Sequence, residues 1–251
     1  MPQPVCQVAS GGLVLQTNLI VLAGGLGTRL RSAVPDVPKP LAPILDRPFL
    51  EYLIESWIDQ GITTLTFLLH HQADLIEAFL NSLQSNGRFG NCAFRTIIES
   101  NPMGTGGAVA YAVRQLHMSG PFMVTNADTW LGSGIKRVFD APLPGMAVIQ
   151  VANSERYGSV RIKGDEVVEF VEKQKSSGGG WVNAGLYHLH ADMFQQWDGQ
   201  AFSLERDLFP KLVASGQVHA VPLETDFIDI GIPEDYLRFC RWVESGRIGV
   251  L

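Results

Sequence analysis

Two patterns in the sequence predict an α/β fold built on a doubly wound, mostly parallel sheet with helices on both faces. From Thr17 to Val151, short apolar runs alternate with longer amphipathic stretches, which is typical of strand–helix–strand units. From Gly158 onward, short runs joined by turn residues predict a small antiparallel part. A length of 251 residues, 46% of them hydrophobic, suits one large domain or at most two small ones.

The first half contains five predicted strands with helices between them. The predicted strands are residues 17–22, 64–69, 93–98, 122–125 and 146–151. Prolines 35, 38, 40 and 43 keep the segment after the first strand non-helical. Pro48 and Gly61 bound the first helix, which has an apolar face, and further helices are expected at residues 75–83 and 107–116.

The second half has shorter and more varied elements. A hairpin is predicted from residues 158–162 and 167–171, joined by the turn Lys163-Gly164-Asp165. The remaining predicted strands are residues 181–189, 218–222 and 227–230, and the remaining helices are residues 204–214 and 233–245. Residues 1–16, which carry Gly, Ser and Pro, are expected to be a flexible leader, with residues 17–251 as a single domain.

Composition excludes several classes of function. The net charge is −6 and there is no basic tract, so general nucleic-acid binding is not expected. No apolar run reaches the roughly 20 residues that span a bilayer, and the N-terminus lacks the features of a signal peptide. Cys6, Cys92 and Cys240 are scattered, which indicates free thiols in the cytoplasm. The oligomeric state is left open, with a homodimer among the alternatives.

The strongest local signal is a glycine-rich loop after the first strand. Gly24, Gly25 and Gly27 would let backbone N–H groups approach phosphate oxygens closely. Arg29 offers a fork of donors suited to phosphate, and Lys39, held between two prolines, adds a point charge. The loop is neither a P-loop nor a dinucleotide-binding fingerprint, because the required lysine or third glycine is missing.

Gly-Gly-x-Gly-Thr-Arg followed by Pro-Lys-Pro resembles the signature of the sugar-1-phosphate nucleotidyltransferases. The resemblance runs from about Asn18 to Trp242 and is greatest to heptose 1-phosphate and mannose-1-phosphate guanylyltransferases. It implies a Rossmann-like, glycosyltransferase-A-like fold, with a nucleotide-binding half at about 17–152 and a sugar-phosphate-binding half at about 153–251. It also implies Mg²⁺ as cofactor and, as substrates, a nucleoside triphosphate (GTP favoured) and a sugar 1-phosphate. The product would be a nucleotide-sugar precursor of cell-surface polysaccharide.

The resemblance assigns the nucleotide to two loops. The first comprises Leu22, Ala23, Gly24, Gly25, Gly27 and Thr28, with Arg29 and Lys39 as catalytic cations. The second, Met103-Gly104-Thr105-Gly106-Gly107-Ala108, resembles the family's base-binding loop, and its small residues would let a flat base lie against the backbone. Glu99 just upstream could accept hydrogen bonds from guanine, although a surface charge is equally compatible.

Two aspartates resemble the family's metal ligands. Asp128, in Asn126-Ala127-Asp128, follows a buried strand, where a carboxylate faces the expected ligand crevice. Asp229 lies between two isoleucines, where a carboxylate buried without a partner would be costly. Two hard carboxylates with phosphate and water oxygens suit Mg²⁺. The structural alternatives are a helix cap for Asp128 and a salt bridge for Asp229.

The sugar site is implied by three further matches. Glu172 and Lys173 resemble the residues that hold the sugar hydroxyls and the sugar's phosphate, which makes Lys173 a further catalytic cation; in isolation they would be a solvated turn. Asn183 and Gly185 match the Asn-Ala-Gly strand, where an amide can both donate to and accept from hydroxyls. Tyr157 and Gly158 match another position on the sugar side.

Other readings stay open at this stage. His70-His71 is expected to be structural or on the surface, and His188 with His190 lacks further ligands for a metal. A non-catalytic nucleotide-sugar sensor, or transfer to a non-sugar phosphate such as phosphocholine, would use much of the same machinery. Neither the base nor the sugar is determined by these motifs, so uridylyl, thymidylyl or cytidylyl transfer remains an alternative.

Overall fold

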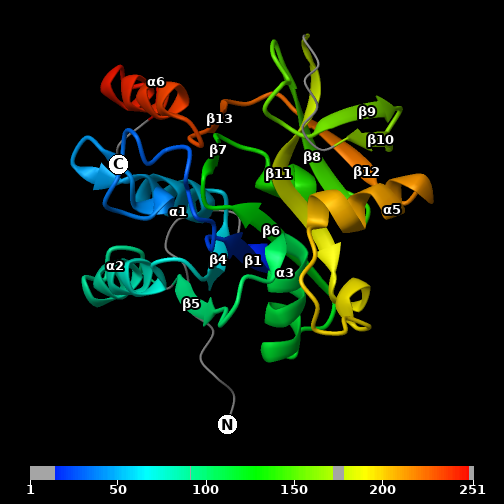
Figure 1. Ribbon diagram of the computed structural model, residues 1–251, viewed down its shortest axis with the longest axis horizontal. Helices are drawn as coiled ribbons and strands as arrows, with labels where there is room; N and C mark the ends of the chain where they lie inside the picture. The colour runs from blue at the N-terminus through cyan, green and yellow to red at the C-terminus, as the bar shows by residue number, and fades with distance from the viewer. Residues whose placement is uncertain (1–14, 91, 172–177, 249–251) are drawn as a thin grey trace.

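The computed structural model describes residues 15–90, 92–171 and 178–248, and its main feature is one nine-stranded sheet (Figure 1). The strand order is β5-β4-β1-β6-β11-β8-β12-β10-β9. In chain order these strands are β1 Leu15–Leu22, β4 Ile62–Leu69, β5 Ala93–Ile98, β6 Pro121–Asn126, β8 Gly145–Val151, β9 Ser159–Lys163, β10 Glu166–Val171, β11 Gly180–His190 and β12 His219–Leu223. Both halves of the chain therefore contribute strands to the same sheet.

The sheet is mixed, which corrects the prediction of a mostly parallel sheet: the predicted antiparallel part joins the parallel strands in one sheet. The pairs β5–β4, β4–β1, β1–β6 and β8–β12 are parallel. In contrast, β11 runs against β6 and β8, and β10 runs against β12 and β9. Hydropathy locates a strand but does not select its neighbours, so the insertion of β11 between β6 and β8 was not foreseeable.

Helices cover both faces of this sheet, as predicted. The longer helices are α1 Phe49–Asp59, α2 Ala73–Ser85, α3 Gly104–Gln115, α5 Phe209–Ala214 and α6 Pro233–Glu244. Alternation along β1 explains the two layers: Leu19 and Val21 join the core that includes α1, α2 and α6, whereas Ile20 joins the core that includes α3 and α5. Within the described ranges, no helix is long and apolar enough to cross a membrane.

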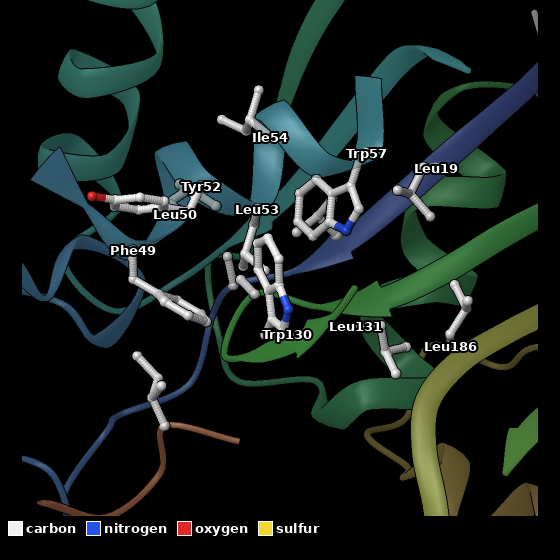
Figure 2. Close-up of a cluster of buried hydrophobic side chains, with 14 of the residues drawn as sticks. Leu19, Phe49, Leu50, Tyr52, Leu53, Ile54, Trp57, Trp130, Leu131 and Leu186 are labelled. Atoms are coloured by element: carbon white, nitrogen blue, oxygen red, sulfur yellow. The ribbon is translucent and has the colours of Figure 1, made fainter. Parts of the chain in front are cut away.

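The layer around α1 holds two short strands in place. Figure 2 shows Phe49, Leu53 and Trp57 of α1 beside Trp130 and Leu131. The Phe239 ring of α6 closes this cluster, with its centroid 4.8 Å from that of Phe49 and 5.5 Å from that of Trp130. Trp130 and Leu131 belong to β7 Thr129–Leu131, which pairs antiparallel with β13 Phe227–Asp229. Packing against α1 and α6 therefore stabilises a two-stranded ribbon at the carboxyl end of β6.

The sequence predicted most longer elements to within about two residues at each end, with two differences at helix starts. Helix α3 begins at Gly104 rather than Gly107. The helix expected at residues 204–214 opens with a π turn, Leu204–Leu208, before α5. Pro210 lacks the N–H that would continue a regular α-helical ladder, which favours a wider turn before it.

Several short elements were not predicted, because they contain too few residues for a period to be visible. They are β2 Pro43–Ile44, β3 Arg47–Pro48, β7, α4 Ile135–Phe139 and the 3₁₀ turns Lys39–Leu41 and Ala191–Phe194. At the N-terminus, β1 already includes Leu15 and Gln16, and the rest of the expected leader lies outside the described residues.

Candidate active site

The site lies where several parallel strands end at the same edge of the sheet. Leu22, the last residue of β1, is in register with Asn126, the last residue of β6. Backbone hydrogen bonds continue past both ends, from Ala23 N to Leu68 O at 3.0 Å and from Ala127 N to Leu22 O at 3.0 Å. The glycine loop and the Asn126-Ala127-Asp128 turn therefore leave the sheet side by side, in the crevice expected of such sheets.

A cavity of about 620 Å³ occupies this edge and collects most of the residues singled out in the sequence. Its walls include, from the nucleotide set, Leu22, Ala23, Gly24, Gly25, Gly27, Thr28, Arg29, Lys39, Glu99, Gly104 and Thr105. They also include Asp128, Asp229, Tyr157, Gly158, Asn183 and Gly185. Glu172 and Lys173 lie outside the described residues. One hollow thus brings together the three groups of motifs that the sequence keeps far apart.

Lys39, Asp128 and Asp229 form a charge cluster in the wall of this cavity. Lys39 Nζ donates to Asp128 Oδ2 at 2.5 Å and to Asp229 Oδ1 at 3.3 Å. The aspartates meet because β13 pairs with β7, which places Asp229 opposite Thr129, and Ile230 N donates to Asp128 O at 3.0 Å. The Lys39 side chain is only 10% exposed, so its charge acts on both carboxylates with little screening by water.

The pKa shifts in this cluster reflect burial and the charges of the neighbouring groups. Burial alone would lower the pKa of Lys39, but the charges of Asp128 and Asp229 raise it above its ordinary 10.5. Burial raises the pKa of Asp229, and the nearby Asp128 adds to the rise, more than Lys39 and the Gly231 N–H lower it. These directions are those of a buried site in which two carboxylates share one ammonium group.

A divalent cation fits this pair of carboxylates. The carboxylates of Asp128 and Asp229 are hard oxygen ligands, and a cation between them would oppose the rise in the pKa of Asp229. Within the residues that the structure describes, no three His, Cys, Asp or Glu side chains gather into a closed metal site. An ion held here would therefore complete its coordination with water or with phosphate oxygens of a ligand.

Gly231 allows the cationic groups to come close to the aspartates. A Cβ on this glycine would stand 2.8 Å from Asp229 Oδ1, 3.0 Å from Lys39 Nζ and 3.4 Å from Arg29 Nη2. Its N–H donates to Asp229 Oδ1 at 2.7 Å. Arg29 therefore shares the neighbourhood of the two aspartates, and the absence of a side chain at Gly231 leaves room for that convergence.

Glu99 and His70 line the same cavity. Glu99 Oε2 accepts a hydrogen bond from Met103 N at 2.9 Å, while Oε1 faces Gly24. Burial raises the pKa of Glu99, opposed by the Met103 N–H and by His70. His70 Nδ1 lies 2.9 Å from the carbonyl oxygen of Glu99, and since a carbonyl only accepts, Nδ1 is the protonated nitrogen.

The base loop rests on a segment from the second half of the chain. Gly106 N donates to Phe202 O at 2.9 Å, and a Cβ on Gly106 would stand 2.1 Å from the Phe202 ring. Gly106 does not line the cavity, so its small size accommodates this ring, whereas Gly104 and Thr105 face the hollow. Thr105 Oγ1 in turn donates to Glu205 Oε2 at 2.6 Å.

The strand β11 forms the opposite wall. Asn183 Oδ1 accepts from Gly185 N at 3.0 Å, and Asn183 Nδ2 donates to the Tyr187 hydroxyl at 2.6 Å. Gly185 has a φ of 73°, and a Cβ there would meet Asn126 Nδ2 at 2.5 Å. Asn183 is thus held in a fixed orientation by its own strand, with Tyr157 and Gly158 beside it in the cavity wall.

Comparison with known proteins gives a consistent result. The family model described as nucleotidyl transferase matches residues 18–245. The chain is 33% identical over 225 residues to D-glycero-alpha-D-manno-heptose 1-phosphate guanylyltransferase of Campylobacter jejuni, a match that covers 88% of this chain and 97% of that protein. The chain belongs to the nucleotidyl transferase family.

Solved structures of this family share the architecture. HddC from Yersinia pseudotuberculosis has a TM-score of 0.79 and 36% identity, with 91% of this chain and 100% of that chain covered. The same protein complexed with GMP-PN has a TM-score of 0.78 and 35% identity, with the same coverage of 91% of this chain and 100% of that chain. Mannose-1-phosphate guanyltransferase of Hypocrea jecorina is 29% identical over 236 residues, covering 90% of this chain and 64% of that longer protein.

The cavity residues of this nucleotidyl transferase that were not assigned to the site from the sequence include His70, Asn126, Arg156 and Glu205. Asn126 belongs to a quoted motif and Arg156 adjoins the Tyr157-Gly158 pair, so their positions alone could have drawn attention to them. His70 was expected to be structural or on the surface, and it does bond the backbone of Glu99 while lining the cavity. Glu205 carried no signal, because Ser203-x-Glu205 resembles an ordinary helix start.

Proposed function

We propose that this chain transfers GMP from GTP to a heptose- or mannose-type sugar 1-phosphate and releases pyrophosphate. The observation that carries the proposal is the convergence of Arg29, Lys39, Asp128 and Asp229 in one cavity, between the base loop and β11. The names of the similar proteins and the GMP-PN complex of HddC support the choice of base and sugar.

The chemistry requires anions to meet, not a base to remove a proton. An oxygen of the sugar 1-phosphate, already anionic at neutral pH, attacks the α-phosphorus of GTP in line; a new O–P bond forms and the bond to the pyrophosphate oxygen breaks. Positioning and charge neutralisation carry such a transfer. Arg29 is suited to the leaving pyrophosphate, Lys39 to the phosphates near the aspartates, and Lys173 to the incoming sugar phosphate.

Asp128 and Asp229 would hold Mg²⁺ in this proposal, since they bring two hard carboxylate groups together in the cavity. When bound, the ion would offset charge on the phosphates. Lys39 would keep the two carboxylates in place by bonding both. Backbone N–H groups of the glycine loop would face the phosphate oxygens at the carboxyl end of β1.

Glu99 supports guanine as the base. Its carboxylate is fixed by Met103 N through one oxygen, which leaves Oε1 directed toward the Gly24 side of the cavity. A carboxylate can accept both the N1–H and the N2–H of guanine, whereas uracil and thymine offer a single ring N–H. Burial of Glu99 would strengthen such bonds.

A substrate grid tests the proposal directly. Five nucleoside triphosphates are incubated with several sugar 1-phosphates and Mg²⁺, and pyrophosphate release is measured. We expect the highest turnover with GTP and a heptose- or mannose-type 1-phosphate. Faster release with another nucleotide would overturn the guanine assignment, and no release from any pair by the folded protein would favour a non-catalytic sensor.

Two variants test the cluster. Asp128→Asn should raise the Mg²⁺ concentration needed for half-maximal turnover by at least roughly tenfold, because it removes a carboxylate ligand. Asp140→Asn is the matched control, since Asp140 is exposed, pairs with Lys136 and does not line this cavity. An unchanged Mg²⁺ titration for Asp128→Asn would contradict ligation. Arg29→Ala should lower turnover far more than thermal stability, and normal turnover would remove Arg29 from the mechanism.

A further inference from the structure

Glu205 is a carboxylate in the cavity wall that the proposed phosphate chemistry does not use. It lies on the π turn Leu204–Leu208, whose start is capped by the Ser203 side chain. Glu205 Oε2 accepts from Thr105 Oγ1 at 2.6 Å and from Ser203 Oγ at 2.8 Å. One carboxylate oxygen thus ties the base loop to the turn.

The second oxygen of Glu205 faces β11. Tyr187 OH donates to Glu205 Oε1 at 3.5 Å, a long contact, and accepts from Asn183 Nδ2 at 2.6 Å. Tyr187 is fully buried, so it cannot reach a ligand in the cavity. Glu205 and Asn183, in contrast, both line the hollow, next to Gly185 and the Tyr157-Gly158 segment. The Oε1 atom is therefore an acceptor with a weak protein partner on the side of the cavity where β11 lies.

The charge of Glu205 limits what it can bind. A carboxylate repels phosphate groups and accepts hydrogen bonds only, so a bound anion would not be placed against it. A hydroxyl group is the complementary ligand, and hydrogen bonds from hydroxyls to carboxylates are among the stronger ones. Among the residues that the structure describes, no Lys or Arg forms a salt bridge with Glu205.

We propose that Glu205 Oε1 accepts a hydrogen bond from a ring hydroxyl of the sugar 1-phosphate, which makes Glu205 a specificity-determining residue for the sugar. This inference rests on the proposed function, because it requires a sugar phosphate in the β11 side of the cavity. Thr105 and Ser203 hold the carboxylate in orientation, so that it discriminates among hydroxyl arrangements. A site built to bond a hydroxyl disfavours the analogue that lacks it.

The experiment is a set of thermodynamic cycles, each of which combines one substitution in the protein with the removal of one hydroxyl from the sugar. Wild type and Glu205→Ala are assayed by pyrophosphate release with GTP and the sugar 1-phosphate that has the highest kcat/KM, and with each of its monodeoxy analogues. We expect one analogue to lose tenfold to hundredfold in kcat/KM with wild type. With Glu205→Ala, kcat/KM for the parent sugar 1-phosphate should fall by the same factor relative to wild type. Removing that same hydroxyl from the sugar should then cause no further fall in kcat/KM.

Controls separate this inference from the alternatives. Glu205→Gln repeats the cycles in case the alanine variant does not fold, and Glu224→Gln serves as an exposed glutamate outside this cavity. The inference would be overturned if, for every analogue, the effects of the substitution and of the missing hydroxyl on kcat/KM were independent of each other. So would an interaction found only with 2′-deoxy or 3′-deoxy GTP, which would assign Glu205 to the ribose. If wild type releases no pyrophosphate with any pair, the proposed function itself fails, which is a different result.

Discussion

Replacing Gly231 by alanine introduces one methyl group at the point where the charged side chains of the site converge. Gly231 is buried, and its φ lies outside the left-handed region, so an alanine backbone is compatible with the position. The added Cβ would stand 2.8 Å from Asp229 Oδ1 and 3.0 Å from Lys39 Nζ. The substitution therefore perturbs the geometry of the cluster without removing any charge.

The size of the effect follows from these distances. A carbon and an oxygen in contact are normally separated by roughly 3.3 Å or more, so Asp229 Oδ1 has to move by about half an ångström. It cannot turn away without weakening its 2.7 Å hydrogen bond from Gly231 N. Because a misplacement of about 1 Å costs on the order of a hundredfold in rate, we expect kcat to fall roughly tenfold to hundredfold. This corresponds to about 1.4–2.7 kcal/mol in activation free energy.

The assay is pyrophosphate release at saturating substrates, with thermal unfolding measured in parallel. Gly180→Ala is the matched control, since nothing lies within 4 Å of a Cβ built on Gly180 and its φ also lies outside the left-handed region. We expect Gly231→Ala to lose activity while its unfolding free energy changes by less than about 1 kcal/mol. Full activity in Gly231→Ala would refute the role of the cluster, and an equal loss in Gly180→Ala would show that the effect is not local.

Three further predictions concern packing and pH. Gly106→Ala should reduce the free energy of unfolding by about 1–3 kcal/mol and lower the melting temperature by several degrees, because its Cβ would overlap the Phe202 ring. This reduction should be smaller when Phe202 is also replaced by alanine. An equal reduction with and without Phe202→Ala would contradict the overlap. Burial lowers the pKa of His188 below 6.5, so the unfolded chain binds a proton that the folded protein does not, and stability should fall as pH drops below about 6.5. Urea denaturation at two pH values measures this change in unfolding free energy, which should be smaller for His188→Gln than for wild type. Equal changes with pH in both proteins would count against the prediction. Burial raises the pKa of Glu99, so its carboxylate form is lost as pH falls through that raised value. The preference for GTP over ATP in kcat/KM should therefore decline with falling pH in wild type and stay constant in Glu99→Gln. A wild-type preference that does not change with pH would argue against guanine recognition by Glu99.

Local patterns carried the prediction of most elements and of the first phosphate loop. The apolar run of β1, the glycines after it and the prolines around Lys39 each determine backbone conformation within a few residues, so they are legible without the fold. The same is true of helix α1, bounded by Pro48 and Gly61. The resemblance to a known family then extended these local observations to Asp128, Asp229 and β11.

The arrangement of the site depended on contacts between distant residues. The two aspartates meet because β13 pairs with β7, and β7 is too short to leave a periodic pattern. Gly106 looked like room for a base and instead receives the Phe202 ring, from a segment nearly a hundred positions away along the chain. Glu205 is held in the cavity wall by a hydrogen bond from Thr105, and nothing in the local sequence around either residue indicates that contact.

The sequence by itself determined where strands, helices and the phosphate-binding loop occur, because backbone preferences and hydrophobic periodicity act over short distances. Tertiary structure alone decided that β11 enters the sheet against its neighbours, and that Lys39 lies between Asp128 and Asp229. Strand pairing and side-chain packing join residues without regard to their separation in the chain, so the charge balance of the site exists only once the fold has formed.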